Sequence, residues 1–430
     1  MNMTRRQLGA SLGVLAASTA LPRLEAQTPE AASSDAPAGA VRPEFPRKAD
    51  FNIVDGYSYL NNAFSHPMPR RSADAYRQAV EQRTTLAPPG VPFVYLNPPP
   101  DTRPMPLDPR AAFAALINAR REEISYISNT STGENLVVEA LGINRFDGNV
   151  VTDALHFEGA LLHLMELKKQ GLDLRVVMPR EGRIELRDLE RVVDRNTRLV
   201  EISFVSMYNG FQHDLKAVCE LAHAHGAYVY VDIIQGVGAV PIDVRATGVD
   251  FAATATYKWL MGDFGLGFLF VREELLGTVV KRTHWSYESA PDTEIHLSPL
   301  DPQRATPLTW TPGHGATRYF QLGTMANSVA AALRVSLPYL RQLGVDNIQN
   351  WRRPMLRKLQ AEMPRLGFPA QTPHDSSSPI VTFAHQDAAS IERKLQRAGI
   401  AVTVTPYYMR IAPSIYNDMH DVDRLLEALA

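Results

Sequence analysis

Short apolar runs rich in β-branched residues alternate with amphipathic segments through the middle of the chain. The runs occupy residues 122–128, 148–153, 174–178, 197–205, 228–233, 250–256 and 265–271. Strands that are apolar throughout are covered on both faces, and helices are the usual connections between parallel strands. The pattern therefore predicts an α/β fold with a mostly parallel, doubly wound sheet. Only a short connection separates the last two runs, so that pair can run antiparallel.

The pattern changes after a helical segment around residues 325–342. Short apolar runs at 378–384, 401–406 and 409–413 alternate with helical segments at 387–398 and 421–429. This arrangement predicts a small α+β domain at the C-terminal end. Two long proline-bearing stretches, 86–100 and 281–318, have the character of binding loops, lids or disordered segments.

Composition excludes several classes of protein. With 430 residues, of which 45% are hydrophobic, the chain can form one large domain and a smaller one. A formal net charge of −2 without any basic block argues against nucleic-acid binding. No apolar run reaches the ~18 residues that a membrane-spanning helix requires, so we expect no membrane span.

The first residues have the layout of an export signal. Arg5 and Arg6 precede an apolar stretch from Leu8 to Leu21, and the motif around the arginines resembles the twin-arginine pattern. We expect cleavage after Ala26 and a flexible leader over 27–47, rich in Ala, Pro, Ser and Glu. An ordinary frayed terminus is the alternative interpretation. The signal predicts a periplasmic or secreted protein that engages the twin-arginine export machinery.

Lys258 lies within an apolar and aromatic run, where a lysine is unusual because burial of an unpaired ammonium is costly. The side chain either extends its amine to water or is buried to serve as a neutral nucleophile. An aldehyde cofactor joined as a Schiff base is the strongest explanation for a buried lysine, and such a cofactor needs a partner for its ring nitrogen and a phosphate site.

Both partners can be found in the sequence. Asp232 ends an apolar strand, where α/β sheets bind their ligands, and Gln235 follows three residues later. Thr130 and Ser131 stand between a strand and a helix, and the N-terminus of a helix attracts anions. Taken alone, Asp232 is also a common turn cap and the hydroxyl cluster a common helix N-cap. The glycines after Lys258 permit close backbone approach.

These motifs carry a resemblance to a known family. D-x-x-Q-x-x-G at 232–238, Y-K-W-L-x-G-x-x-G-x-G at 257–267 and RYFQLGT at 318–324 resemble motifs of class V aminotransferases, which are fold type I pyridoxal-phosphate enzymes. The resemblance covers roughly residues 50–430 and is strongest to the isopenicillin N epimerase-like branch. After the signal peptide at 1–26 and the leader at 27–47, the resemblance implies an N-terminal segment at 48–105 packing on the small domain, a large domain at 106–325 that binds pyridoxal 5′-phosphate, and a small domain at 326–430.

The resemblance also implies the roles of individual residues. Lys258 is the Schiff-base lysine, Asp232 the partner of the pyridine nitrogen, Gln235 a contact of the ring oxygen, and Arg410 the partner of the substrate carboxylate. The remaining implied residues are phosphate ligands (Thr130, Ser131, Thr256 and, across a dimer interface, Thr324), a ring stacked on the cofactor (Phe157, or alternatively His156), a neighbour of the lysine (Tyr257) and a substrate contact (Asn62). We expect no metal.

Some residues depart from the pattern of the family. Tyr257 replaces the histidine that is usual in desulfurases, and Ala255 stands where desulfurases carry a phosphate-binding serine. The one cysteine, Cys219, lies in an amphipathic segment, and the predicted C-terminal domain has none. This excludes persulfide chemistry on a mobile cysteine of the chain and any intramolecular disulfide.

The predicted function is that of an exported pyridoxal-phosphate enzyme acting on the α-amino group of an amino acid or peptide-linked residue through a Schiff base. Transamination or a related modification of a secreted metabolite is the first expectation, with epimerisation or C–S or C–C lyase chemistry as alternatives. The resemblance implies a homodimer with shared sites. A binding protein that retains the fold without catalysis is a further alternative. A nicotinamide-dependent enzyme is disfavoured because no G-x-G-x-x-G opens a first βα unit.

Overall fold

The computed structural model describes residues 43–84, 107–145, 147–289 and 311–430. The predicted 86–100 stretch and most of the 281–318 stretch lie outside these ranges, as do the predicted signal and most of the leader. None of the described helices is both long and apolar enough to cross a membrane.

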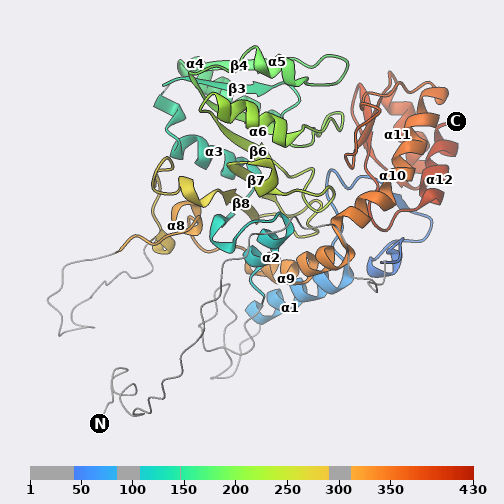
Figure 1. Cartoon of the computed structure of the whole chain (residues 1–430). Helices are drawn as coiled ribbons and strands as arrows, with labels where there is room; N and C mark the ends of the chain where they lie inside the picture. The colour runs from blue at the N-terminus through green and yellow to red at the C-terminus, as the bar shows by residue number, and fades with distance from the viewer. Residues whose placement is uncertain (1–42, 85–106, 146, 290–310) are drawn as a thin grey trace, which may run out of the picture. The chain divides into compact units, whose positions relative to one another are not determined.

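A seven-stranded sheet forms the centre of the fold, with strand order β2-β8-β7-β6-β5-β3-β4 (Figure 1). Its strands are β2 (Ile124–Ile127), β3 (Asn149–Asp153), β4 (Asp173–Val177), β5 (Thr197–Ser203), β6 (Tyr228–Asp232), β7 (Phe251–Ala255) and β8 (Gly267–Val271). The pairs from β4 through β7 are parallel, whereas β8 runs antiparallel to both β7 and β2. The mostly parallel α/β sheet is thus confirmed, and so is the antiparallel β7–β8 pair.

The strands are apolar on both faces because both faces are covered. Successive residues of a strand point to opposite faces, and alternate residues of the sheet enter two separate hydrophobic clusters. Val229 and Val231 of β6 join one cluster with Cys219 of α6 (Leu215–Ala224), and Tyr230 joins the other with Val137 of α3 (Thr130–Ala140). This two-sided burial explains why the strands show no polar alternation.

The helices of the central sheet begin at capping residues. Asn129 caps α3 by accepting a hydrogen bond from the backbone N–H of Thr132, and Asp214 caps α6 in the same way. The remaining helices of this part are α4 (Glu158–Gln170), α5 (Leu186–Glu190), α7 (Val244–Thr247) and α8 (Thr317–Phe320). The Asn129 cap fixes the start of α3, which lies at the candidate functional site.

A second, three-stranded antiparallel sheet has the order β11-β12-β9, and a short parallel pair joins β1 to β10. Its strands are β9 (Val381–Ala384), β11 (Thr403–Val404) and β12 (Tyr408–Ile411), and the pair is β1 (Ser58–Tyr59) with β10 (Ile400–Ala401). The helices that pack near it are α10 (Val345–Glu362), α11 (Ala388–Ala398) and α12 (Met419–Leu429). These elements match the expected α+β pattern, although the sequence reasoning did not identify α10.

Two further helices lie along α9 (Asn327–Leu343). Both α1 (Arg70–Thr84) and α2 (Pro109–Leu116) contact α9, and Figure 1 shows α1 and α9 side by side. The predicted helix at 325–342 corresponds closely to α9. Because α9 leads directly into α10, it connects the neighbourhood of the central sheet to the second sheet.

Candidate active site

A cavity of about 320 Å³ opens at the carboxyl ends of the central parallel strands. This volume falls at the lower end of the range for small-molecule sites, and the position is the one at which open α/β sheets bind ligands. The cavity is lined by Asn129, Thr130, Ser131, Phe157, Ser203, Val205, Met207, Asp232, Ile234, Gln235, Ala255, Tyr257 and Lys258. Residues predicted from distant parts of the sequence therefore meet in one place.

Lys258 is buried, with 8% of its surface exposed. It follows β7 and lines the cavity. Burial lowers the pKa of the amine to about 8, and the nearby Arg410 guanidinium lowers it further, while the Asp232 carboxylate opposes the shift. The Lys258 side chain is therefore buried and does not extend its amine to water. An amine with this pKa is partly neutral near pH 7 and can act as a nucleophile toward a carbonyl.

Asp232 and Gln235 form the floor of the cavity beside Lys258. Burial raises the pKa of the Asp232 carboxyl, and the Ile234 N–H, which donates to its Oδ1 at 2.9 Å, works against the rise. The Gln235 amide nitrogen donates to the carbonyl of Ala63 at 2.9 Å, and its oxygen accepts from the Trp259 indole at 3.1 Å. An amide NH₂ has two hydrogens, so Gln235 keeps one N–H for a ligand.

The N-terminus of α3 forms the other end of the cavity. Thr130 and Ser131 are its first residues, and the Oγ1 of Thr130 accepts from the Ala255 N–H at 2.9 Å. The hydroxyl hydrogen of Thr130 is therefore available to a ligand. Unpaired N–H groups, the helix dipole and the two hydroxyls together form a cradle for a phosphate or another anion.

The structure distinguishes Phe157 from His156. Phe157 lines the cavity as the residue that precedes α4, whereas the His156 ring is fully buried and lies behind the cavity wall. The His156 Nδ1 is 2.8 Å from the Ser203 Oγ, and its Nε2 is 3.3 Å from the Glu201 Oε1. Of the two predicted stacking rings, only Phe157 faces the cavity.

Of the neighbouring residues Tyr257 and Thr256, only Tyr257 lines the cavity. The Tyr257 ring lines the cavity and stacks on Phe264, with 4.3 Å between ring centroids. The Thr256 hydroxyl instead donates to the carbonyl oxygens of Asp263 and Leu266 at 2.8 and 2.9 Å. Thr256 thus stabilises the glycine-rich turn, and the structure does not bring it to the anion cradle.

Arg410 lies next to the cavity without lining it. Its guanidinium donates to the carbonyl of Met207 at 3.0 Å and to the Thr403 hydroxyl at 3.2 Å, and its buried Nε has no hydrogen-bond partner among the described residues. Asn62, the other predicted substrate contact, is fully buried. Its amide donates to the Ala412 carbonyl and accepts from the Tyr416 hydroxyl. Asn62 therefore joins the N-terminal segment to the region after β12.

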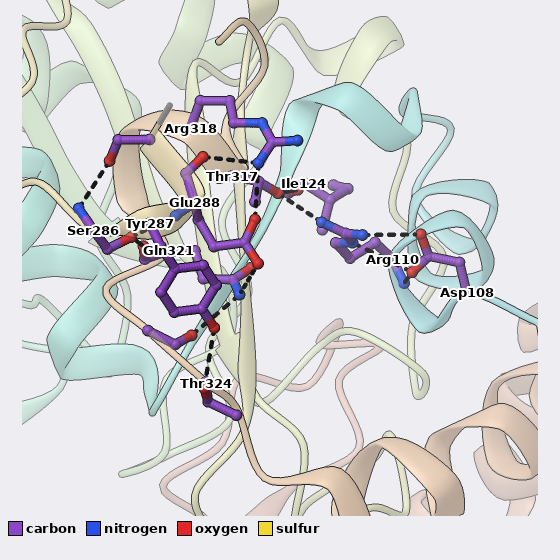
Figure 2. Close-up of polar contacts among 12 residues, drawn as sticks. Asp108, Arg110, Ile124, Ser286, Tyr287, Glu288, Thr317, Arg318, Gln321 and Thr324 are labelled. Atoms are coloured by element: carbon purple, nitrogen blue, oxygen red, sulfur yellow. Dashed lines mark hydrogen bonds and ion pairs between the residues drawn. The ribbon is translucent and has the colours of Figure 1, made fainter. Parts of the chain in front are cut away.

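Thr324 stands apart from the cavity and is exposed. The Thr324 and Tyr287 hydroxyls are 3.0 Å apart. Figure 2 shows this pair near the separate contact between Glu288 and Gln321. Its predicted role is in the site of a second subunit, and that role stays a prediction.

Sequence reasoning missed Ser203, which lines the cavity at the end of β5. Its Oγ accepts from the Phe157 N–H at 3.3 Å and contacts the His156 ring. Ser203 pairs with Asp232 across β5 and β6, so both residues end neighbouring parallel strands. That shared position was the available signal, because the carboxyl ends of parallel strands meet at one edge of a sheet.

The residues fit pyridoxal 5′-phosphate. A partly neutral amine, a buried carboxylate, an amide with a spare N–H and an anion cradle surround one cavity that also presents a phenyl ring. The amine suits the cofactor's aldehyde, the carboxylate its ring nitrogen and the amide its ring oxygen. The anion cradle suits its phosphate, and the phenyl ring suits the face of its pyridine ring.

Comparison with known proteins gives one family. The family model described as "Aminotransferase class-V" matches residues 108–425. A probable cysteine desulfurase of Methanothermobacter thermautotrophicus is 28% identical over 319 residues, covering 73% of this chain and 74% of that protein. A cysteine desulfurase of Escherichia coli O6:K15:H31 is 27% identical over 340 residues, covering 74% and 80%.

Solved structures share the fold. The apo cysteine desulfurase of Thermococcus onnurineus NA1 superposes with a TM-score of 0.73 at 20% identity, covering 90% of this chain and 97% of that one. The cystine C–S lyase C-DES, in complex with its reaction product cysteine persulfide, superposes with a TM-score of 0.72 at 18% identity, covering 90% and 99%. A mutant of C-DES carries glycine covalently linked to the pyridoxal-phosphate cofactor, with a TM-score of 0.73 at 17% identity, covering 89% and 99%.

Proposed function

The chain belongs to the class-V aminotransferase family of pyridoxal-phosphate enzymes, and on that premise we propose that it acts on the α-amino group of an amino acid or a peptide-linked residue. The observation that carries the proposal is the burial of Lys258 beside Asp232 in a cavity that ends in an anion cradle. A lysine whose pKa is lowered by burial beside a carboxylate in a cavity is typical of a catalytic site, which favours an enzyme over a binding protein.

Each side chain has a distinct task in this proposal. The cofactor, when bound, withdraws electrons from the substrate α-carbon. The Asp232 carboxylate holds a proton at the pyridine nitrogen, and the start of α3 binds the phosphate. The Lys258 amine moves a proton at the α-carbon. The Arg410 guanidinium binds the substrate carboxylate with the paired donors that suit a planar anion, exchanging its present contact with the Met207 carbonyl.

Cleavage of a C–S bond is the first reaction that we propose for this site. The named relatives are cysteine desulfurases, and a structural neighbour is a cystine C–S lyase. Cys219 is the sole cysteine, is 1% exposed and lies in α6, and burial raises its thiol pKa to about 12. Such a thiol does not ionise readily, so the proposed reaction releases its sulfur product directly into solution.

Transamination, the first expectation from the sequence, is the second candidate. It is compatible with the burial of Cys219, the sole cysteine, because transamination needs no thiol to accept sulfur. The two reactions differ in their need for a second substrate, because a transaminase requires a 2-oxo acid to regenerate its amine-accepting form. Epimerisation, as in the isopenicillin N epimerase-like branch, requires neither a 2-oxo acid nor release of sulfur.

The test uses the purified, cofactor-loaded protein with L-cysteine, L-cystine and a panel of other amino acids. Sulfur release without a 2-oxo acid supports the lyase, turnover that depends on a 2-oxo acid supports the transaminase, and loss of optical purity supports the epimerase. Lys258→Ala should abolish turnover, whereas Cys219→Ala, the matched control, should retain it. Turnover of the Lys258→Ala protein at the wild-type rate would contradict the proposed role of the lysine.

Export and dimerisation complete the proposal. We propose that the twin-arginine machinery moves the folded, loaded protein and that cleavage leaves Gln27 as the first residue. Intact mass of the protein recovered from the periplasm of a bacterial host tests this directly, and a full-length chain confined to the cytoplasm would contradict it.

We also propose a homodimer in which Thr324 of one subunit contacts the phosphate in the other.

A further inference from the structure

Four titratable side chains lie in series behind the cavity wall. His163 lies on α4 with 23% of its side chain exposed, and Glu134 lies on α3 with 2% exposed. Glu201 of β5 and His156 are both fully buried. The functional assignments above use none of these four groups, and buried carboxyl groups are rare in proteins unless they are paired.

The contacts lead from the surface to the cavity. The His163 Nδ1 is 2.7 Å from the Glu134 Oε1. The Glu134 and Glu201 carboxyl groups are close enough to interact electrostatically. The Glu201 Oε1 is 3.3 Å from the His156 Nε2, and the His156 Nδ1 is 2.8 Å from the Ser203 Oγ. Ser203 lines the cavity that Asp232 also lines.

Adjacent burial of Glu134 and Glu201 implies that they share a proton. Two neighbouring carboxylates away from water repel each other strongly, so one of them is kept neutral. The buried Glu201 Oε2 has no hydrogen-bond partner among the described residues, and a proton held between the two carboxyl groups provides one. Burial is the main cause that raises the pKa of both groups.

We propose that His163, Glu134, Glu201, His156 and Ser203 form a proton path between the protein surface and the cavity, and that this path carries protons to and from Asp232 and the group bound against it. The five residues act as positioning residues because they work through Asp232. The inference shares its cavity with the proposed function but does not depend on which amino acid reacts.

The transfer balances at each atom. A proton that arrives from the cavity binds the Ser203 Oγ, and the hydroxyl proton of Ser203 moves to the His156 Nδ1. The proton on the His156 Nε2 passes to the Glu201 carboxylate, and the proton shared by the carboxyl pair passes through Glu134 to the His163 Nδ1. His163 then releases a proton to water, and the reverse sequence delivers a proton to the cavity.

Other charged groups face the path and influence its protonation. Burial lowers the pKa of the His156 imidazole, while Asp232, Asp153 and Glu134 favour its protonated form. Asp153 itself is paired with His213 at 3.0 Å. Tyr230 of β6 is held neutral by burial and by the nearby carboxylates, which raise its pKa. Outside the carboxyl pair, the path is therefore surrounded mainly by acidic groups, and these favour retention of a proton.

The first experiment uses the cofactor-free protein and infrared spectroscopy. We expect the carbonyl band of a buried, protonated carboxyl group near neutral pH, and its loss or shift in Glu134→Gln and Glu201→Gln. Glu166→Gln, on the exposed side of α4, is the matched control and should leave the band unchanged. The absence of the band from the wild-type protein, or its persistence in both path variants, would overturn the proposal.

The second experiment uses the holoenzyme and does not require the buried glutamates to be replaced. His163→Ala changes a partly exposed residue, and we expect the visible absorbance of the cofactor to respond to a pH jump on the order of 100-fold more slowly, the lower end of what a positioned proton donor or acceptor contributes. Free imidazole in the buffer should restore the rate, which a purely structural role would not allow. An unchanged response, or a slow response that imidazole does not rescue, would contradict the path. Because the infrared test omits cofactor and substrate, its failure is distinguishable from failure of the proposed function.

Discussion

Replacement of Asp232 by asparagine should move the titration of the Lys258 amine to lower pH. The pKa of Lys258 is lowered from 10.5 to about 8, and the Asp232 carboxylate is the group that opposes this shift. A shift of this size raises the neutral fraction at pH 7 from about 0.03% to about 9%, roughly 300-fold, which corresponds to about 3 kcal/mol. Removing the negative charge of Asp232 leaves desolvation unopposed, so the neutral fraction should rise further.

The assay is a brief reductive methylation of the cofactor-free protein across a range of pH, followed by peptide mass spectrometry. The extent of labelling at Lys258 should rise with a midpoint near pH 8 in the wild-type protein and at lower pH in Asp232→Asn. Arg410→Gln should shift the midpoint the opposite way, because the guanidinium lowers the pKa of the amine. Lys216, which is exposed on α6, gives an internal reference in the same digest.

Two results would refute this reasoning. A wild-type midpoint near 10.4, the value of an ordinary lysine, would show that the amine is not desolvated. A higher midpoint in Asp232→Asn than in the wild type would show that the carboxylate does not stabilise the ammonium form. The first result would remove the physical basis for a nucleophilic Lys258, and the second would remove the electrostatic role assigned to Asp232.

Three further predictions concern the cradle, the buried carboxyl pair and Gly238, which follows β6. Ser131→Ala should weaken retention of the cofactor by roughly 10- to 100-fold, the loss of one hydrogen bond to a charged group, whereas Thr256→Ala should leave affinity near wild type; both are measured by fluorescence titration of the cofactor-free protein. Burial raises the pKa of Glu134 from 4.5 to about 8, so between these pH values the folded state retains a proton that the unfolded state releases. The unfolding free energy should therefore fall by about 1.4 kcal/mol for each pH unit over this range. In urea titrations at several pH values, Glu134→Gln should show a weaker dependence of the unfolding free energy on pH. Gly238→Ala should lower the unfolding free energy in urea by about 2–3 kcal/mol, since the residue has a φ of +86° and an added Cβ would lie 2.6 Å from the Trp259 carbonyl oxygen.

Residues at the ends of strands were the most predictable part of the site. Asp232 and Lys258 follow strongly apolar strands, and a polar residue in that position is informative because parallel strands end at one edge of a sheet. Thr130 and Ser131 were predictable for a similar reason, since the polar residues between a strand and a helix mark the start of the helix. The position of Lys258 within an apolar run carried the signal that it is buried.

The direction of a side chain was less predictable than its place in the chain. Thr256 neighbours the lysine, yet its hydroxyl faces the glycine-rich turn, which only the tertiary structure reveals. Glu134 lies on a helix, where glutamate is usually solvated, and its burial follows from the packing of α3 against the sheet and α4. The helix α10 contains a proline and many charged residues, so its local sequence disfavours a confident assignment.

The pairing of β1 with β10 has a consequence for how the chain folds. Ser58 and Tyr59 align with Ile400 and Ala401, and the Ser58 hydroxyl donates to Asp421, 363 residues away. Contacts of such separation form late, because a long loop must close before they contribute. Until residues 400 and 401 have been synthesised, the strand at Ser58–Tyr59 therefore has no neighbour. A product terminated before residue 400 would expose this unpaired strand to aggregation and degradation.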